Sequence, residues 1–189
     1  MKEYAIIVCA KAESERLPGK NLLPLDGKPL IQHTFDFIED NFPVEFKNIW
    51  VVSDSEIILK MADVYGFGMM REPSEYINNS HNMPLMRWID SHLKKLKYVM
   101  FPPTSPVRSS RTKDFVEHFL THDYNSGLTV YKSERGQYKA NGSVFMWHRD
   151  QLIYNDLICN NPFLYVDQKG FDIDDKKEFE KAERHLKGE

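Results

Sequence analysis

The chain has 189 residues, of which 41% are hydrophobic and 28% charged, and its formal net charge is -3. This length suffices for one domain with a sizeable core. The charge balance gives no reason to expect binding to nucleic acid or to a membrane surface. No apolar stretch has membrane-spanning length and the N-terminus has no signal-peptide pattern, so a reducing cytoplasm is expected. The two cysteines, Cys9 and Cys159, have no metal-ligand spacing.

Apolar strands alternate with amphipathic helices along the chain. In chain order, we expect a strand at 4–10, a helix at 29–41, a strand at 48–52, a helix at 54–65, a short strand at 67–70, a helix at 83–96, a strand at 98–101, a helix at 112–122, strands at 127–131, 143–147 and 163–166, and a helix at 176–186. This alternation predicts a single domain over 1–189 with a three-layer, Rossmann-like, doubly wound and mostly parallel α/β sheet. Ligands of such sheets bind beyond the carboxyl ends of the strands.

The loop after the first strand, KAESERLPGKN, carries three bases, Lys11, Arg16 and Lys20. It has neither the Walker A pattern nor the G-x-G-x-x-G pattern. The three bases could still converge on a polyphosphate, with backbone N–H groups assisting. The alternative is a solvated loop with scattered charges, and the loop taken alone favours that alternative.

Polar residues also follow the next strands. Asp54 is expected to cap the helix that comes after it. Arg71 precedes a proline turn and either reaches a phosphate or is an ordinary surface arginine. In PPTSPVRSS, Thr104 and Arg108 offer a hydroxyl and a guanidinium on a loop stiffened by prolines. Such a loop suits a binding edge, although it could also be only a rigid connection.

Two further segments lie late in the chain. Asn141-Gly142, before an apolar run, is a turn signal, although the Asn141 amide could also bind a ligand. Asp172 and Asp174 lie two residues apart in an expected extended stretch, so both side chains point to one side and Ile173 points into the core.

Paired carboxylates on one side favour a hard cation such as Mg²⁺ when phosphates supply the other oxygens. The alternative, in which Asp172 and Asp174 are turn or capping residues, is about as well supported by the residues alone. Asp175 is expected to cap the closing helix.

Taken together and in order, these segments resemble the cytidylyltransferases that activate sialic acids and related 2-keto sugar acids. The opening IIVCAKAESERLPGKNLLPLDGKPLIQHTFD is similar to the family pattern A-R-x-x-S-K-x-[LI]-P-x-K-N, a spacer and G-K-P-L. The segments VVSDSEIILKMADVYG, REPSEY, PPTSPVRS, NGSVFMW and FDIDDKKEFEKAE continue the resemblance over nearly the whole chain. The stretch RLPGK also resembles the Kdo cytidylyltransferases.

The resemblance implies an enzyme that makes a CMP-sugar and pyrophosphate from CTP and a sialic-acid-like sugar acid, with Mg²⁺ as cofactor. It implies that the nucleotide is bound by Lys11, Ala12, Ser14, Arg16, Lys20, Asn21 and Arg71. The implied catalytic residues are Lys11, Lys20, Asp172 and Asp174, of which the two aspartates hold the metal. The sugar substrate is expected at Thr104, Arg108 and Asn141.

The chain also departs from the family pattern. Lys11 stands where the motif has arginine, Glu15 where it has lysine, and Pro102 where glutamine usually precedes P-T-S-P. Only a short connection at 132–140 replaces the longer arm that pairs two subunits, so any homodimer is expected to be weaker or differently built. Two alternatives stay open: a nucleotidyltransferase for another sugar or sugar phosphate, including Kdo-like acids, or a nucleotide-binding homologue without catalysis.

Overall fold

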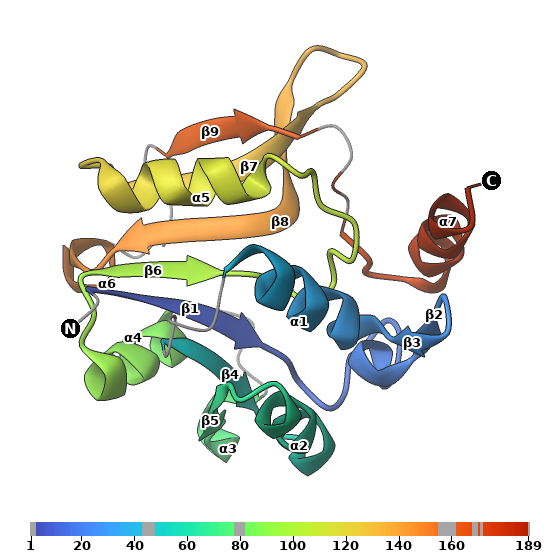
Figure 1. The fold of residues 1–189 in the computed structure, drawn as a ribbon, viewed down its shortest axis with the longest axis horizontal. Coiled ribbons are helices and arrows are strands. Elements are labelled where there is room, and N and C mark those ends of the chain that lie inside the picture. The colour runs from blue at the N-terminus through green and yellow to red at the C-terminus, as the bar shows by residue number, and fades with distance from the viewer. Residues whose placement is uncertain are drawn as a thin grey trace.

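Seven strands form one sheet in the part of the chain that the structure describes (Figure 1). This computed structural model describes residues 3–42, 48–77, 82–154, 162–167, 170 and 172–188, so Cys159 lies outside the described residues. The strands are β1 (Tyr4–Cys9), β4 (Ile49–Ser53), β5 (Gly68–Arg71), β6 (Lys97–Met100), β7 (Ser126–Lys132), β8 (Tyr138–His148) and β9 (Phe163–Val166).

The first strand, β1, lies inside the sheet between β4 and β6 and runs parallel to both. The full order is β5-β4-β1-β6-β8-β7-β9. β8 runs antiparallel to its neighbours β6 and β7, and the other pairs are parallel. The expected doubly wound, mostly parallel α/β sheet is therefore confirmed. The carboxyl ends of β1, β4, β5 and β6 share one edge, where sheets of this kind bind ligands.

Helices cover both faces of the sheet. The helices of the described residues are α1 (Leu30–Asn41), α2 (Glu56–Val64), α3 (Ser74–Ile77), α4 (Asn82–Leu93), α5 (Thr112–Thr121), α6 (Asp150–Tyr154) and α7 (Lys176–Leu186). α1, α2 and α5 pack on one face, and α4 and α6 on the other. Along β1, Ile6 and Val8 join the first cluster, and Ala5 and Ile7 join the second. Both faces of β1 are thus buried, which accounts for its continuous apolar sequence.

The last helix, α7, belongs to a separate apolar cluster rather than to either face of the sheet. In this cluster Ile173 and Ala182 pack with Leu25 and Leu30. Leu25 comes from a small hairpin formed by β2 and β3, whose ranges are Pro24–Leu25 and Lys28–Pro29. Ile173 is fully buried, as the sequence predicts. The cluster therefore fixes residues 172–174 close to the end of the loop that follows β1.

The start of α7 confirms the expected role of Asp175. Its carboxylate accepts a hydrogen bond of 2.9 Å from the Glu178 amide, and the Glu178 carboxylate accepts one from the Asp175 amide. This capping box satisfies two backbone donors at the helix end. No helix among the described residues combines the length and the hydropathy needed to cross a membrane.

The turn expected at Asn141-Gly142 is wrong. Both residues lie inside β8, which pairs with β6 on one side and β7 on the other. The register of the β7–β8 pair shifts between Leu128 and Val130, so the irregularity is a bulge. Gly142 has a φ of 73°, and a bulge is a place where a strand accommodates such a residue. Pairing of the flanking residues 138–140 and 145–148 of β8 outweighs the local turn preference.

Candidate active site

The loop after β1 is anchored at its first residues to the ends of neighbouring strands. The Ala12 amide donates a 2.6 Å hydrogen bond to Asp54 Oδ1, just past β4. Lys11 Nζ donates to the Ile77 carbonyl, and Asn21 Nδ2 donates a 2.8 Å hydrogen bond to the Lys11 carbonyl. Asn21 is itself buried, at 4% exposure. The loop is thus closed on itself and attached to both β4 and α3.

These contacts correct the expected role of Asp54. The N-cap of α2 is Ser55, whose hydroxyl accepts from the Ile58 amide. Asp54 instead holds the loop through Ala12. Two consecutive residues with capping side chains made the local pattern ambiguous, and the contact across the sheet edge decides between them.

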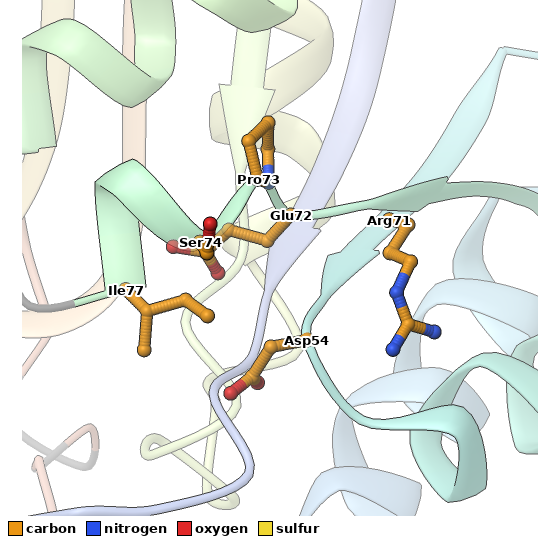
Figure 2. A pocket seen from close by; sticks show the side chains of 6 residues that line it. All are labelled: Asp54, Arg71, Glu72, Pro73, Ser74 and Ile77. Atoms are coloured by element: carbon orange, nitrogen blue, oxygen red, sulfur yellow. The ribbon is translucent and has the colours of Figure 1, made fainter.

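A pocket of about 440 Å³ lies beside this anchor, lined by Asp54, Arg71, Glu72, Pro73, Ser74 and Ile77. Figure 2 shows the Glu72 and Asp54 side chains projecting toward the side on which Ser74 and Ile77 lie, whereas Arg71 projects away. Arg71 is exposed and forms an ion pair with Glu56. The expected nucleotide-binding residue Arg71 therefore stands at the rim of the pocket, with its charge already compensated.

Glu72 is the residue of this pocket that sequence reasoning missed. Glu72 is only 3% exposed, and neither carboxylate oxygen has a hydrogen-bond partner within the described part of the chain. Burial raises the pKa of Glu72, the Lys11 ammonium opposes this shift, and the Asp54 carboxylate adds to it. The sequence signal that could have identified Glu72 as a site residue is its position directly after a strand and before a proline, at the edge of the sheet where ligands bind.

The far end of the same loop gathers positive charge around Asp174. Lys20, 7% exposed at the start of the 3-10 helix η1 (Lys20–Leu22), donates to the Ile173 carbonyl at 2.6 Å. The same ammonium lies 3.4 Å from Asp174 Oδ1, and Arg16 lies 2.7 Å from Asp174 Oδ2. The structure thus brings together three residues that the sequence singled out. Ser14 lies partly exposed between the two ends of the loop.

Asp172 lies next to this cluster and is held from two sides. Its Oδ1 is buried and has no hydrogen-bond partner. Burial raises the pKa of Asp172, a hydrogen bond from the Thr104 side chain opposes this shift, and the Asp174 charge adds to it. The Thr104 carbonyl also accepts from the Ile173 amide at 2.8 Å. A Cβ on Gly142 would lie 3.0 Å from Asp172 Cγ, so the bulge needs glycine here.

A family model described as cytidylyltransferase matches residues 5–185, which include all of these contacts. The chain belongs to the cytidylyltransferase family. The resemblance inferred from the sequence motifs is thereby confirmed, and the two ends of the loop are features of a cytidylyltransferase chain.

Two relatives illustrate the range of this family. An N-acylneuraminate cytidylyltransferase of Streptococcus agalactiae serotype V is 28% identical over 132 residues, 68% of this chain and 32% of that protein. This chain thus matches about a third of the length of that relative. A CMP-N,N'-diacetyllegionaminic acid synthase of Legionella pneumophila is 26% identical and covers 82% of each chain.

A solved structure confirms the fold. The CMP:2-keto-3-deoxy-manno-octonic acid synthetase complexed with CTP superimposes with a TM-score of 0.76 over 99% of both chains, at 15% identity. This likeness supports the nucleotide-diphospho-sugar transferase arrangement of the sheet, in agreement with the expected fold class.

Arg108 is held by the protein in this member of the family. Its guanidinium donates to the carbonyls of Ser143 and Pro102 and to the Thr34 hydroxyl, at 3.1, 2.6 and 3.0 Å. It also lies over two phenylalanine rings. Burial lowers the pKa of Arg108 to about 9, opposed by the charges of two nearby aspartates. These contacts brace the Pro102–Arg108 loop against β8, and the substrate contact expected of Arg108 stays a prediction.

Asn141 is likewise occupied by protein groups. Its side chain is 2% exposed. The amide nitrogen donates to the Asp167 carbonyl at 2.9 Å, and the amide oxygen accepts from the Ser143 amide at 3.1 Å. Both ends of the amide thus fix the bulge that presents Gly142 to Asp172. Of the expected substrate residues, Thr104 is the one in contact with the acidic pair.

The described residues contain no group of three or more His, Cys, Asp or Glu side chains that could hold a metal ion. Asp172 and Asp174 offer two carboxylates, and the unpartnered Asp172 Oδ1 is the acceptor that a hard cation needs. The Asp174 oxygens are paired with Arg16 and Lys20. The pair therefore fits a divalent cation whose other ligands come from a phosphate chain and water.

Proposed function

We propose that this protein transfers the CMP group of CTP to a sialic-acid-like 2-keto sugar acid and releases pyrophosphate. The observation that carries the proposal is the double attachment of one loop. Its first residues meet a pocket past β4 and β5, and its last residues meet the acidic pair before α7. A nucleotide lying along this loop has its base near the pocket and its phosphates near Asp172 and Asp174.

The positive charges support this direction. Arg16 and Lys20 lie at the Asp174 end, where a triphosphate needs neutralisation. Lys20 is buried and held by a backbone carbonyl, so its ammonium is a fixed charge. Arg16 is exposed and, among the described residues, is paired with Asp174 alone, so it can exchange that carboxylate for a phosphate oxygen. The loop thus presents one preorganised and one adaptable cation.

In the proposed reaction, the anomeric hydroxyl oxygen of the sugar acid attacks the α-phosphorus of CTP. The bond from the α-phosphorus to the bridging oxygen breaks, pyrophosphate leaves with that oxygen, and the hydroxyl proton is released to water. No covalent enzyme intermediate is formed. The chain contributes by positioning the two substrates and by stabilising the charge that develops on the phosphates. Thr104 holds the Asp172 carboxylate in place during this step.

Mg²⁺ is proposed as the cofactor, held by Asp172 and Asp174. When bound, it would neutralise phosphate charge and polarise the attacked phosphorus. Asp172 contributes the buried oxygen that has no partner, and Asp174 becomes available as Arg16 moves to the phosphates. This exchange links arrival of the triphosphate to completion of the metal site.

Pyrophosphate release tests the proposal. The protein is incubated with Mg²⁺, one of the four ribonucleoside triphosphates and one sugar acid from a panel of sialic, legionaminic and Kdo-like acids. We expect release with CTP and a sialic-acid-like acid. Release with Kdo alone would instead assign the substrate class of a relative from Hydrogenovibrio crunogenus, a 3-deoxy-manno-octulosonate cytidylyltransferase that is 35% identical over 75 residues. CTP binding without release from any acid would contradict the proposed activity.

The proposed oligomer is a weak homodimer or one built through another surface. The 132–140 connection is the tip of a β7–β8 hairpin, where Lys132 pairs with Tyr138, and it projects beyond the sheet (Figure 1). A hairpin of this length offers little surface for a partner. Light scattering at micromolar concentration measures the oligomeric state, and a tight dimer held by residues 126–142 would contradict the expectation.

A further inference from the structure

The buried Glu72 carboxyl group has no function in the contacts described so far. Glu72 lines the pocket past β5 and is only 3% exposed. Neither of its carboxyl oxygens has a hydrogen-bond partner among the described residues. A buried acceptor without a partner costs free energy, because it loses its hydrogen bonds to water. A ligand that donates hydrogen bonds to this group would recover that cost.

We propose that Glu72 reads the nucleotide base by accepting a hydrogen bond from the 4-amino group of cytosine, and so distinguishes CTP from UTP. This inference rests on the proposed function and adds to it a residue that determines nucleotide specificity.

The chemistry of the pocket disfavours the charged parts of the two substrates. Glu72 and Asp54 project toward the same side, whereas Arg71 projects away (Figure 2). The Lys11 ammonium, whose charge acts on Glu72, donates to the Ile77 carbonyl. Two carboxylates would repel a triphosphate or the carboxylate of a sugar acid. A neutral group with N–H donors suits the pocket, and within the nucleotide the cytosine base is the part that has such a group.

The position of the pocket also matches the proposed direction of the nucleotide. Ala12 is bound to Asp54, one of the residues that line the pocket, while Lys20 of the same loop is bound beside Asp174. With the phosphates at Arg16 and Lys20, the base is directed toward the other end of the loop. Glu72 lies at that end.

The two pyrimidines present opposite groups to a carboxylate. Cytosine has an amino group at position 4, and each of its N–H bonds can donate. Uracil has a carbonyl oxygen there, which would face a carboxylate oxygen with no proton between them. An unmatched buried acceptor of this kind discriminates strongly between ligands, because one ligand pairs with it and the other leaves it unpaired. A bound amino donor also stabilises the ionised form of Glu72, against the effect of burial.

Calorimetric titration with nucleotides in the presence of Mg²⁺ and without sugar acid tests this inference. The ligands are CTP, UTP and the triphosphate of pyrimidin-2-one riboside, which lacks the 4-amino group. The proteins are the wild type, Glu72→Gln, Glu72→Ala and the control Glu75→Gln. Glu75 is an exposed glutamate three residues further along the chain and does not line the pocket, so the control removes the same charge outside the site. Thermal melting verifies that each variant is folded.

The wild type and Glu75→Gln should bind CTP about tenfold or more tightly than either other ligand. In Glu72→Gln the amide can also donate to a carbonyl, so the preference for CTP over UTP should fall to a few-fold or less. In Glu72→Ala, the 4-amino group should no longer improve binding over pyrimidin-2-one. A CTP preference that survives in both Glu72 variants overturns the role of Glu72 while leaving the proposed function intact. Failure of the wild type to bind CTP overturns the proposed function itself.

Discussion

A buried or half-buried acid lies beside each end of the loop after β1, but the two acids have different surroundings. At one end, Asp174 is paired with Arg16 and Lys20. At the other end, Glu72 has no hydrogen-bond partner among the described residues. We propose that the carboxylate with cations around it exchanges them for phosphates and a metal, and that the carboxyl group without partners accepts from a neutral donor. Under this proposal the same side-chain chemistry would handle charge at one end of the loop and recognise the base at the other.

The largest effects are expected from Asp172→Asn and Asp174→Asn, which keep the side-chain shape and remove one charge. Each should lower turnover by about 10²-fold or more, since the proposed cation would supply several kcal/mol of transition-state stabilisation. The melting temperature without ligand should change little or rise. Pyrophosphate release and thermal melting are measured on the same samples.

The control for these two variants is Asp63→Asn, which removes the same charge from an exposed position of α2. It should leave turnover unchanged. If Asp172→Asn and Asp174→Asn instead unfold the protein and the folded remainder keeps Mg²⁺-dependent activity, the two aspartates are structural, and the comparison between the loop ends fails.

A smaller effect is expected from the two cations at this end, and their difference in burial predicts different outcomes. Lys20→Met removes a fixed buried ammonium and should lower kcat by about 10²-fold. Arg16→Gln removes an exposed guanidinium and should mainly raise the KM for CTP, by roughly tenfold or less. Steady-state kinetics at varied CTP separates the two parameters. Equal effects of both changes on kcat would mean that burial does not distinguish the two cations.

The β7–β8 hairpin contains a matched pair of glycines, Gly136 in the turn between the strands and Gly142 in the bulge of β8. Gly142 and Gly136 both have positive φ, at 73° and 77°. Gly136→Ala should cost about 1 kcal/mol of stability from its backbone conformation alone, because nothing lies within 4 Å of the new Cβ. Gly142→Ala should cost more, since its Cβ meets Asp172, and it should also lower turnover. Chemical denaturation and pyrophosphate release measure both effects, and full activity of Gly142→Ala would show that Asp172 tolerates displacement.

The smallest effect is a pH dependence of stability from Asp172. Burial is the main cause of its raised pKa, and the charges of Asp174 and Glu178 add to the shift, whereas the Thr104 hydrogen bond and the Lys20 charge oppose it. An acid with a raised folded-state pKa binds protons more tightly in the folded state, so its ionisation destabilises the fold as pH rises through that pKa. Asp172→Asn should therefore gain stability over the wild type at neutral pH.

That gain should shrink as pH falls through the raised pKa and disappear below the ordinary aspartate pKa. Urea denaturation across this pH range measures it. A gain that is the same at all pH values would show that ionisation of Asp172 is not its source.

Much of this arrangement follows from local sequence patterns. The apolar runs and helical periodicities predict the sheet and its helices, because both faces of the central strands must be covered. The spacing of Asp172, Ile173 and Asp174 predicts the buried isoleucine, since side chains alternate in an extended segment. The family motifs single out Lys20 and Arg16 before their contacts with Asp174 are known.

What the sequence could not predict depends on contacts between distant segments. Asn141-Gly142 has a turn pattern, but pairing of the β8 residues on either side of it makes it a bulge inside the strand. Asp54 has a capping pattern, but the Ala12 amide across the sheet edge takes its carboxylate. Glu72 is not among the residues that the sequence motifs single out, and its burial is a property of the folded chain. Each of these differences lies at the edge where ligands are expected, where local preferences are most often overridden.

The most direct test asks whether the two ends of the loop have separate roles in catalysis and in base recognition. It measures kcat and kcat/KM for CTP and for UTP, with one accepted sugar acid. The proteins are the wild type, Glu72→Gln and Asp172→Asn. We predict that Glu72→Gln reduces the CTP-to-UTP ratio of kcat/KM by about tenfold or more and changes kcat at saturating CTP little. Asp172→Asn should lower kcat for both nucleotides and leave the ratio unchanged. A shift in the ratio with Asp172→Asn, or an equal loss for both nucleotides with Glu72→Gln, would contradict the account.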